Sequence, residues 1–323
     1  MKPIVLGMTC YSSHIETFLN WTLPSLLAPG NFPALSKERV IQINIHTDSA
    51  GYALLCQQIP YPPGVEFMFY MDASPREEKY LQLGQHQSAD LRKAKNMGAD
   101  YHCLMPDFVY SQDYFTGVLA AAERGHKAIA RLVLSTTKEF ICPELEKYRH
   151  DGVLLLPANH LATLGLIYIH QGVEHWLAER IDYPNTHVLV WEGENTLHLC
   201  SPHCTPVYIA NEAICPVESN SPIDGILDKV IIGDIYCPKP EDGIVQIEIT
   251  PKDKRPLQEK RVDLKEFTRI FQVDTYSSPR QFQIWDAETI DPIRREMLGS
   301  WGWWNDVHIA THKQVVNEAL LKP

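Results

Sequence analysis

SADLRKAKNMGADYHCLMPD, residues 88–107, contains the pattern that most constrains the fold of this chain. The composition of its first part predicts a helix over 87–97. Gly98 follows as a candidate left-handed cap, because glycine adopts a positive φ without a steric penalty. A buried strand, 101–105, is predicted next. The stretch therefore predicts a helix that runs back along a sheet and a strand that brings Asp107 to its carboxyl end.

The same alternation of strand and helix extends to both sides of this stretch. The further strands are predicted at residues 4–8, 40–45, 65–70 and 128–134, and the further helices at residues 15–27 and 112–124. Strands that alternate with helices at this pace predict an α/β fold, a GT-A-like doubly wound, mostly parallel sheet. Ligands of such sheets bind at the carboxyl ends of the strands, so the polar loops that follow the predicted strands are the predicted site.

The alternation fades after about residue 143, where prolines are frequent and an irregular C-terminal extension is predicted. We expect a nucleotide-binding part at 1–140, an acceptor-side part of the same domain at 141–250 and a C-terminal helical tail at 251–323. A charged run with proline at both ends marks the seam before the tail. The tail contains the Trp-rich stretch 301–304, which is expected to cover the core or to contact a partner such as a second copy of the chain.

The composition indicates a globular protein, with 45% hydrophobic and 21% charged residues among 323. A formal net charge of −11 argues against a nucleic-acid polymer as partner, because such binders display clustered Lys and Arg. No secretory signal and no apolar run of about 18 residues is visible. The eight cysteines are dispersed, which favours reduced thiols, and we expect a cytoplasmic protein.

Three well-known site signatures are missing from the sequence. It has neither the glycine-rich phosphate loop of P-loop NTPases nor the GxGxxG turn of dinucleotide-binding folds after its first strand. The GxSxG elbow of α/β-hydrolases is also absent. Nucleotide binding would therefore rest on polar groups in the loops.

The 88–107 stretch resembles the GT-A glycosyltransferases, whose chains show an Arg-bearing helix, a Gly-Ala-Glu/Asp-Tyr turn and a strand that ends in Asp-x-Asp. The segments 24–31 and 106–111 resemble stretches of bacterial proteins of that glycosyltransferase-like class. The resemblance covers about the first 140 residues. It implies an enzyme that binds a nucleotide sugar and transfers the sugar to a glycan or another hydroxyl acceptor, with bacterial surface glycans as a natural pathway.

The resemblance also implies a set of site residues. The loops after the first two strands would hold the base and ribose, and cations on the helix would neutralise phosphate. The nucleotide-contacting residues are then Thr9, Tyr11, Thr47, Asp48, Arg92, Lys93 and Asp107. Two purely structural interpretations stay open. Asp107 is then a turn or capping residue, and Arg92 and Lys93 form only the solvated face of a helix.

The sequence departs from the family at Met105-Pro106-Asp107-Phe108, which keeps one of the two acids of Asp-x-Asp. In metal-dependent members such carboxylates hold Mg²⁺ or Mn²⁺, which neutralises the leaving diphosphate. Here Asp107 is the expected metal ligand, with His203 as a second ligand from the C-terminal part. Alternatively, cations such as Lys138 replace the ion.

Catalysis of glycosyl transfer by inversion requires a carboxylate base near the acceptor hydroxyl. Asp224 in the stretch 221–225 is the candidate. A turn or structural role is the competing interpretation for both Asp224 and His203.

Two other functions also stay open, a nucleotidyltransferase of the same fold class and a non-catalytic glycan-binding or scaffold module. The loop after the first strand, 9–13, lacks the glycines and cations usual in nucleotidyltransferases.

Overall fold

The computed structural model describes most of the first 254 residues and one strand beyond them. The described residues are 1–11, 13–72, 79–130, 133–170, 188–192, 196–201, 207–216, 223, 230–233, 235–238, 240–254 and 280–283. Most of the expected helical tail lies outside them, at 255–279 and 284–323, and this includes the Trp-rich stretch 301–304.

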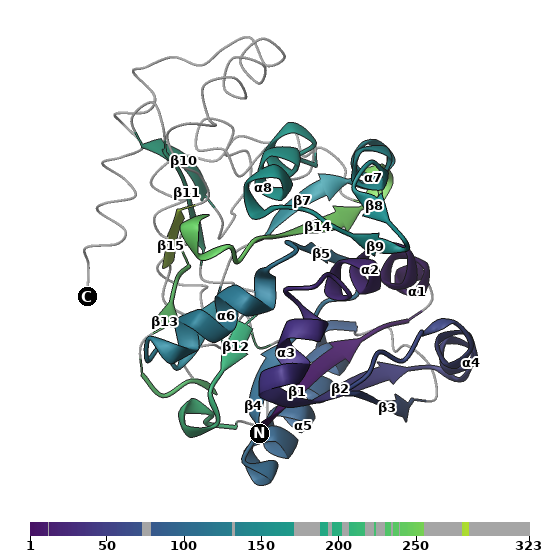
Figure 1. Cartoon of the computed structure of the whole chain (residues 1–323), viewed down its shortest axis with the longest axis vertical. Helices are drawn as coiled ribbons and strands as arrows, with labels where there is room; N and C mark the ends of the chain where they lie inside the picture. Colours follow the sequence, from purple (N-terminus) through teal and green to yellow (C-terminus); the bar gives the residue numbers. More distant parts are fainter. Residues whose placement is uncertain are drawn as a thin grey trace.

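A central seven-stranded sheet organises the molecule (Figure 1). Its strands are β1 (Lys2–Thr9), β2 (Arg39–Thr47), β3 (Val65–Met71), β4 (Asp100–Cys103), β6 (Ala128–Ala130), β12 (Val207–Ile209) and β13 (Ile235–Tyr236). They lie in the order β13-β6-β12-β4-β1-β2-β3. Within this sheet β12 pairs antiparallel with both neighbours, and the other pairs are parallel. The predicted mostly parallel α/β sheet is therefore confirmed.

Helices cover both faces of the sheet, as the doubly wound pattern requires. The helices are α1 (Ser13–Thr17), α2 (Leu23–Leu26), α3 (Phe32–Glu38), α4 (Ser49–Gln58), α5 (Lys79–Met97), α6 (Tyr114–Glu123), α7 (Lys138–Glu146) and α8 (Ala158–Ile167), with a π-helix, η1, at Phe18–Thr22 and 3₁₀ turns η4 (Asn211–Ala213), η6 (Pro240–Asp242) and η7 (Lys252–Lys254). Helix α5 packs on β1 and β4, while α3 contacts β2 and α6 contacts β6.

Alternation along β1 assigns its side chains to the two faces. Ile4 and Leu6 belong to the buried cluster that includes Phe32 of α3. Val5 belongs to the other cluster, together with Leu91 of α5. Because side chains of a strand alternate between faces, an apolar run with little polar interruption predicts a strand buried on both sides.

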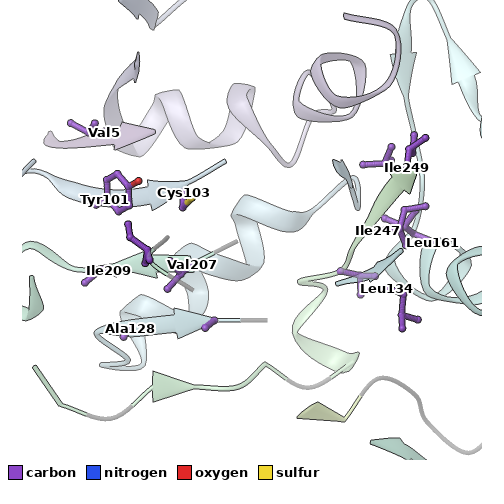
Figure 2. Close-up of a cluster of buried hydrophobic side chains, with 14 of the residues drawn as sticks. Val5, Tyr101, Cys103, Ala128, Leu134, Leu161, Val207, Ile209, Ile247 and Ile249 are labelled. Atoms are coloured by element: carbon purple, nitrogen blue, oxygen red, sulfur yellow. The ribbon is translucent and has the colours of Figure 1, made fainter. Parts of the chain in front are cut away.

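Smaller sheets extend the architecture. One three-stranded sheet pairs β14 (Gln246–Thr250) with β5 (Phe108–Tyr110) and β7 (Leu134–Thr137). A second three-stranded sheet contains β10 (Val188–Glu192), β11 (Thr196–Ser201) and β15 (Arg280–Gln283). A two-stranded sheet pairs β8 (Arg149–His150) with β9 (Val153–Leu154). Figure 2 shows the two parts of one buried cluster, with Val5, Tyr101 and Val207 on strands of the central sheet and Ile247 near Leu134 on the smaller one.

Several predicted boundaries differ from the structure for identifiable reasons. The strand predicted at 128–134 ends at Ala130 as β6. Leu134 already begins β7 in the smaller sheet, where the distant strand β14 supplies a parallel partner. Helix α5 begins at Lys79 rather than at residue 87, and the helix predicted at 15–27 is interrupted by the π-helical turn η1. Gly98 has φ +66° directly after α5, as its capping role predicts.

Two further expectations concern the thiols and the membrane. Among the cysteines whose side chains the structure describes, six form no disulfide: Cys10, Cys56, Cys103, Cys142, Cys215 and Cys237. The reduced state of the thiols stays a prediction. Among the helices that the structure describes, none has the length and apolar character needed to cross a bilayer.

His102 is a buried histidine in the core that should leave a signature in the pH dependence of stability. Its Nε2 lies 3.1 Å from the Tyr114 hydroxyl, and burial lowers the pKa of His102 to about 3. The folded state therefore binds fewer protons at this site than the unfolded state below about pH 6.5. Stability should fall as the pH drops from about 6.5 toward 3 and should stop changing from this source below 3.

Replacing His102 with Phe should flatten this pH dependence. Denaturant unfolding at several pH values would give the free energy of unfolding for both proteins. We expect their slopes to differ by up to about 1.4 kcal/mol per pH unit between pH 6 and 4. Parallel curves for the two proteins would show that His102 does not titrate on unfolding.

Candidate functional site

The carboxyl edge of the central sheet contains a topological switch point. The chain places β2 and β3 on one side of β1, and then crosses to the other side of β1 to add β4. Both β2 and β4 are parallel to β1. The loops that follow β1 and β4 consequently diverge at one edge, which is where open α/β sheets bind ligands.

Asp107 lies on the β4 side of this switch point, in the turn between β4 and β5. Its side chain is 17% exposed, and its Oδ2 lies 3.9 Å from Nε2 of His14 in α1. The backbone carbonyl of Asp107 accepts a hydrogen bond of 2.8 Å from the Ile249 amide of β14. The turn is thus fixed by the second sheet, and its carboxylate faces the helix that follows β1.

The loop after β1 contacts the opposite side, where β2, β3 and α5 meet. The Tyr11 hydroxyl donates to Oδ2 of Asp72 at 2.7 Å and accepts from Nε2 of Gln82 at 3.1 Å. Nδ1 of His86 lies 3.0 Å from the Thr9 hydroxyl, and its Nε2 lies 2.9 Å from the same Asp72 oxygen. These contacts connect two of the residues predicted to bind nucleotide, Thr9 and Tyr11, to a polar cluster.

A second polar layer lies beneath this cluster, in the interior. Asp90 of α5 is 3% exposed; its Oδ1 accepts from the Asn44 amide at 2.7 Å and its Oδ2 lies 3.1 Å from Nε2 of His46. A Cβ on Gly7 of β1 would be 2.5 Å from Oδ2 of Asp90. The buried carboxylate is therefore accommodated because β1 has no side chain at this position.

Thr47 and Asp48 follow β2 at the same edge but make local contacts. Oδ1 of Asp48 accepts from the Gly51 amide at 2.7 Å, which is the geometry of an N-cap on α4. The Thr47 side chain is buried, and its hydroxyl has no hydrogen-bond partner among the described residues. It packs against Gly51, where an added Cβ would collide with it.

Arg92 and Lys93 lie further from the edge than expected, because α5 runs opposite to the parallel strands. Gln82 and His86, in its first half, meet the loops at the carboxyl edge. Nζ of Lys93 instead contacts the Tyr70 hydroxyl at 2.5 Å and Oδ1 of Asn44 at 3.5 Å. Arg92 is half-buried on the same helix. A nucleotide contact by either residue stays a prediction.

Burial dominates the electrostatics of this edge. The pKa of the Cys10 thiol is raised well above its ordinary value by burial, and the carboxylates of Asp107 and Asp48 raise it further. Cys10 is therefore a neutral core thiol and not a nucleophile. Burial, followed by the adjacent His46 imidazole, lowers the pKa of His86 to about 4, although Asp72 and Asp90 oppose the shift.

One group of residues, not assembled from the sequence, could hold a metal ion. One nitrogen each of His46 and His86 and one oxygen of Asp72 lie within 4.8 Å of one another. His46 and Asp72 were recognisable as polar residues at strand ends. His86 was missed because the predicted helix started one residue after it. The expected ligand His203 and the expected base Asp224 lie outside the described residues.

The fold and this edge define an α/β protein with a polar site at the switch point of its sheet. No protein-family model and no curated protein sequence matches the chain. Parts of the chain are similar to several solved structures.

One similar structure is 4-diphosphocytidyl-2C-methyl-D-erythritol synthase from Anaerococcus prevotii DSM 20548, with 15% identity over 42% of this chain and 58% of that one and a TM-score of 0.29. Mouse xyloside xylosyltransferase 1 has 11% identity over 46% and 59% of the two chains and a TM-score of 0.31. Residues 1–349 of S. aureus TarS have 12% identity over 41% and 36%, with a TM-score of 0.27. The chain spans less than two thirds of each of these proteins.

Replacing Gly7 with Ala should disturb the buried layer around Asp90. The added methyl would lie 2.5 Å from Oδ2 of Asp90 and 2.9 Å from the Tyr101 hydroxyl, both of which are held in the core. We expect a loss of about 1–3 kcal/mol in the free energy of unfolding, as is typical of overpacking. Chemical denaturation would measure it.

A second glycine provides the control for this experiment. A Cβ on Gly98 would have nothing within 4 Å, and Asn tolerates its positive φ. The Gly98→Asn variant should therefore stay close to the parent protein. Equal stability of the Gly7→Ala variant and the parent would contradict the close packing of α5 on β1.

Proposed function

We propose that the chain is a glycosyltransferase that binds a nucleotide-activated sugar across the carboxyl ends of β1, β2 and β4 and transfers the sugar to the hydroxyl of a glycan or another acceptor. The observation that carries this proposal is the position of Asp107. It is the acid that the sequence resemblance assigns to the donor, and it lies beside the loop after β1 at the switch point, with His14 3.9 Å away.

Asp107 can serve a nucleotide in two ways. It can accept a hydrogen bond from ribose, or it can supply one oxygen to Mg²⁺ or Mn²⁺. Mg²⁺ at nucleotide sites is commonly held by one or two carboxylates together with phosphate oxygens and waters. A single carboxylate therefore fits an ion that arrives with the diphosphate. Such an ion would supply charge neutralisation for the leaving group.

A cation of the chain itself is available near the same loop. Lys138, at the start of α7, is 29% exposed, and its Nζ lies 3.7 Å from Oε1 of Glu16 in α1. Because α1 follows the loop after β1, this ammonium group lies on the side of the sheet edge where the diphosphate is proposed to bind. It would favour the transition state, in which negative charge develops on the leaving phosphate.

In the proposed reaction the acceptor oxygen forms a bond to the anomeric carbon while the bond from that carbon to the diphosphate oxygen breaks. The hydroxyl proton passes to a carboxylate base, for which Asp224 remains the candidate. Thr9, Tyr11, Thr47 and Asp48 position the base and ribose in this scheme, and His203 is a further candidate for the metal. A cytoplasmic location and bacterial surface glycans as products belong to the same proposal.

Replacing Asp107 with Asn tests the central assignment. Nucleotide sugars would first be screened by thermal shift, since a ligand that binds only the folded state raises its melting temperature. With the donor so found, release of the nucleoside diphosphate would be measured. We expect the variant to lose about 10- to 100-fold in kcat/KM, which corresponds to a charge-assisted hydrogen bond of roughly 1.5–3 kcal/mol.

The matched control is Asp113→Asn. Asp113 is an exposed acid that directly precedes α6 and makes no side-chain cap, so its replacement should leave activity unchanged. A fully active Asp107→Asn enzyme would remove Asp107 from the mechanism. Turnover of a sugar phosphate with a nucleoside triphosphate, in place of a nucleotide sugar, would identify a nucleotidyltransferase instead.

A further inference from the structure

Three metal-ligating side chains from separate elements converge at the β2 and β3 side of the sheet edge. His46 is the penultimate residue of β2, Asp72 directly follows β3, and His86 lies in α5. One ring nitrogen of each histidine and one carboxylate oxygen lie within 4.8 Å of one another. The two imidazole rings are stacked, with centroids 4.1 Å apart and planes inclined by 9°.

Each histidine is also held through a second contact. Nε2 of His46 lies 3.1 Å from Asp90, whose other oxygen accepts from Asn44. Nδ1 of His86 lies 3.0 Å from the Thr9 hydroxyl. Metal-binding histidines are typically oriented in this manner, because one ring nitrogen bonds to a carboxylate or another polar group while the other binds the ion. These contacts hold both rings at the cluster. Because an ion binds in the plane of an imidazole ring, the stacked rings would tilt apart around it.

The carboxylate is oriented as well. Oδ2 of Asp72 accepts from the Tyr11 hydroxyl at 2.7 Å, and Gln82 donates to that same hydroxyl. The Asp72 side chain is 34% exposed, whereas that of His86 is 11% exposed. The cluster is therefore held by an outer layer of polar groups and reachable from the side of Asp72.

The charge of the cluster suits a cation. Imidazole binds a metal ion through an unprotonated ring nitrogen. A divalent cation would bring positive charge to the Asp72 carboxylate.

We propose that His46, Asp72 and His86 form a binding site for one divalent transition-metal ion of the Zn²⁺ type. Two imidazole nitrogens and one carboxylate oxygen favour Zn²⁺ or Co²⁺ over Mg²⁺ and Ca²⁺, which prefer oxygen ligands. Three protein ligands leave a coordination position open for water or a ligand. The site is distinct from Asp107 and holds whether or not the chain transfers a sugar.

The ion would also tie the loop after β1 to three other elements. Thr9 contacts one ligand, His86, and Tyr11 contacts another, Asp72. Binding would therefore order this loop against β2, β3 and α5. It is the loop that the proposed function assigns to the nucleotide.

Metal titration of the full chain tests the proposal. Protein stripped with a chelator would be titrated with Zn²⁺ against a competing indicator, and with Co²⁺ followed by visible absorption. We expect one equivalent of Zn²⁺ to bind and a Co²⁺ spectrum without a sulfur charge-transfer band. Asp72→Asn and His86→Gln should each weaken binding by at least about tenfold.

Two controls make the result specific. Asp107→Asn should bind Zn²⁺ like the parent, as should His160→Gln, which changes an exposed histidine on α8. If a ligand variant does not fold, judged by circular dichroism and thermal melting, Thr9→Val replaces it. That variant removes the hydroxyl beside His86 while leaving all three ligands, and it should weaken binding by about tenfold.

Other outcomes would overturn the proposal. One is that the parent protein binds no Zn²⁺. Another is that the folded Asp72→Asn and His86→Gln variants still bind it. A thiolate band in the Co²⁺ spectrum would place the ion on cysteines. Loss of binding in Asp107→Asn alone would place it at the other side of β1. Glycosyl transfer is measured separately, by release of the nucleoside diphosphate.

Discussion

The close approach of α5 to β1 at Gly7 is the constraint on which the edge of the sheet depends. Only a residue without a side chain leaves space there for the buried Asp90 carboxylate. Asp90 in turn holds Asn44 and His46 of β2 by hydrogen bonds. A buried carboxylate is costly unless it is paired and hydrogen-bonded, so this layer fixes how α5 lies on the sheet. The position of α5 then determines which of its residues reach the loops.

The parts of the fold that depend on local periodicity could be predicted from the sequence. Buried apolar runs such as 4–8 and 40–45 predicted parallel strands, and the expected doubly wound sheet is present. The boundary between β6 and β7 could not be predicted, because β7 is defined by its pairing with residues more than a hundred positions away. Pairing over such separations leaves no periodic signal in a short window.

The candidate site was predictable in part, because parallel strands end at one edge of a sheet. This brought Thr9, Thr47 and Asp107 to the same edge. The metal-ligating cluster was not predictable, since it requires the first half of α5 to lie over β2 and β3. The direction of α5 likewise carries Lys93 toward Tyr70 and Asn44, and away from the loops. Strand ends can be inferred from spacing, whereas helix placement depends on tertiary packing.

The place of β12 in the sheet has a consequence for synthesis of the chain on the ribosome. Strand β6 borders β12 and β13, and both are made some seventy or more residues after it. When β6 emerges, β1 to β4 can already pair with one another, but β4 still awaits β12 as its outer neighbour. The nascent protein would therefore carry an open edge at β4 until residue 209 has been added. During that interval a chaperone that shields unpaired strands would have a target at this edge.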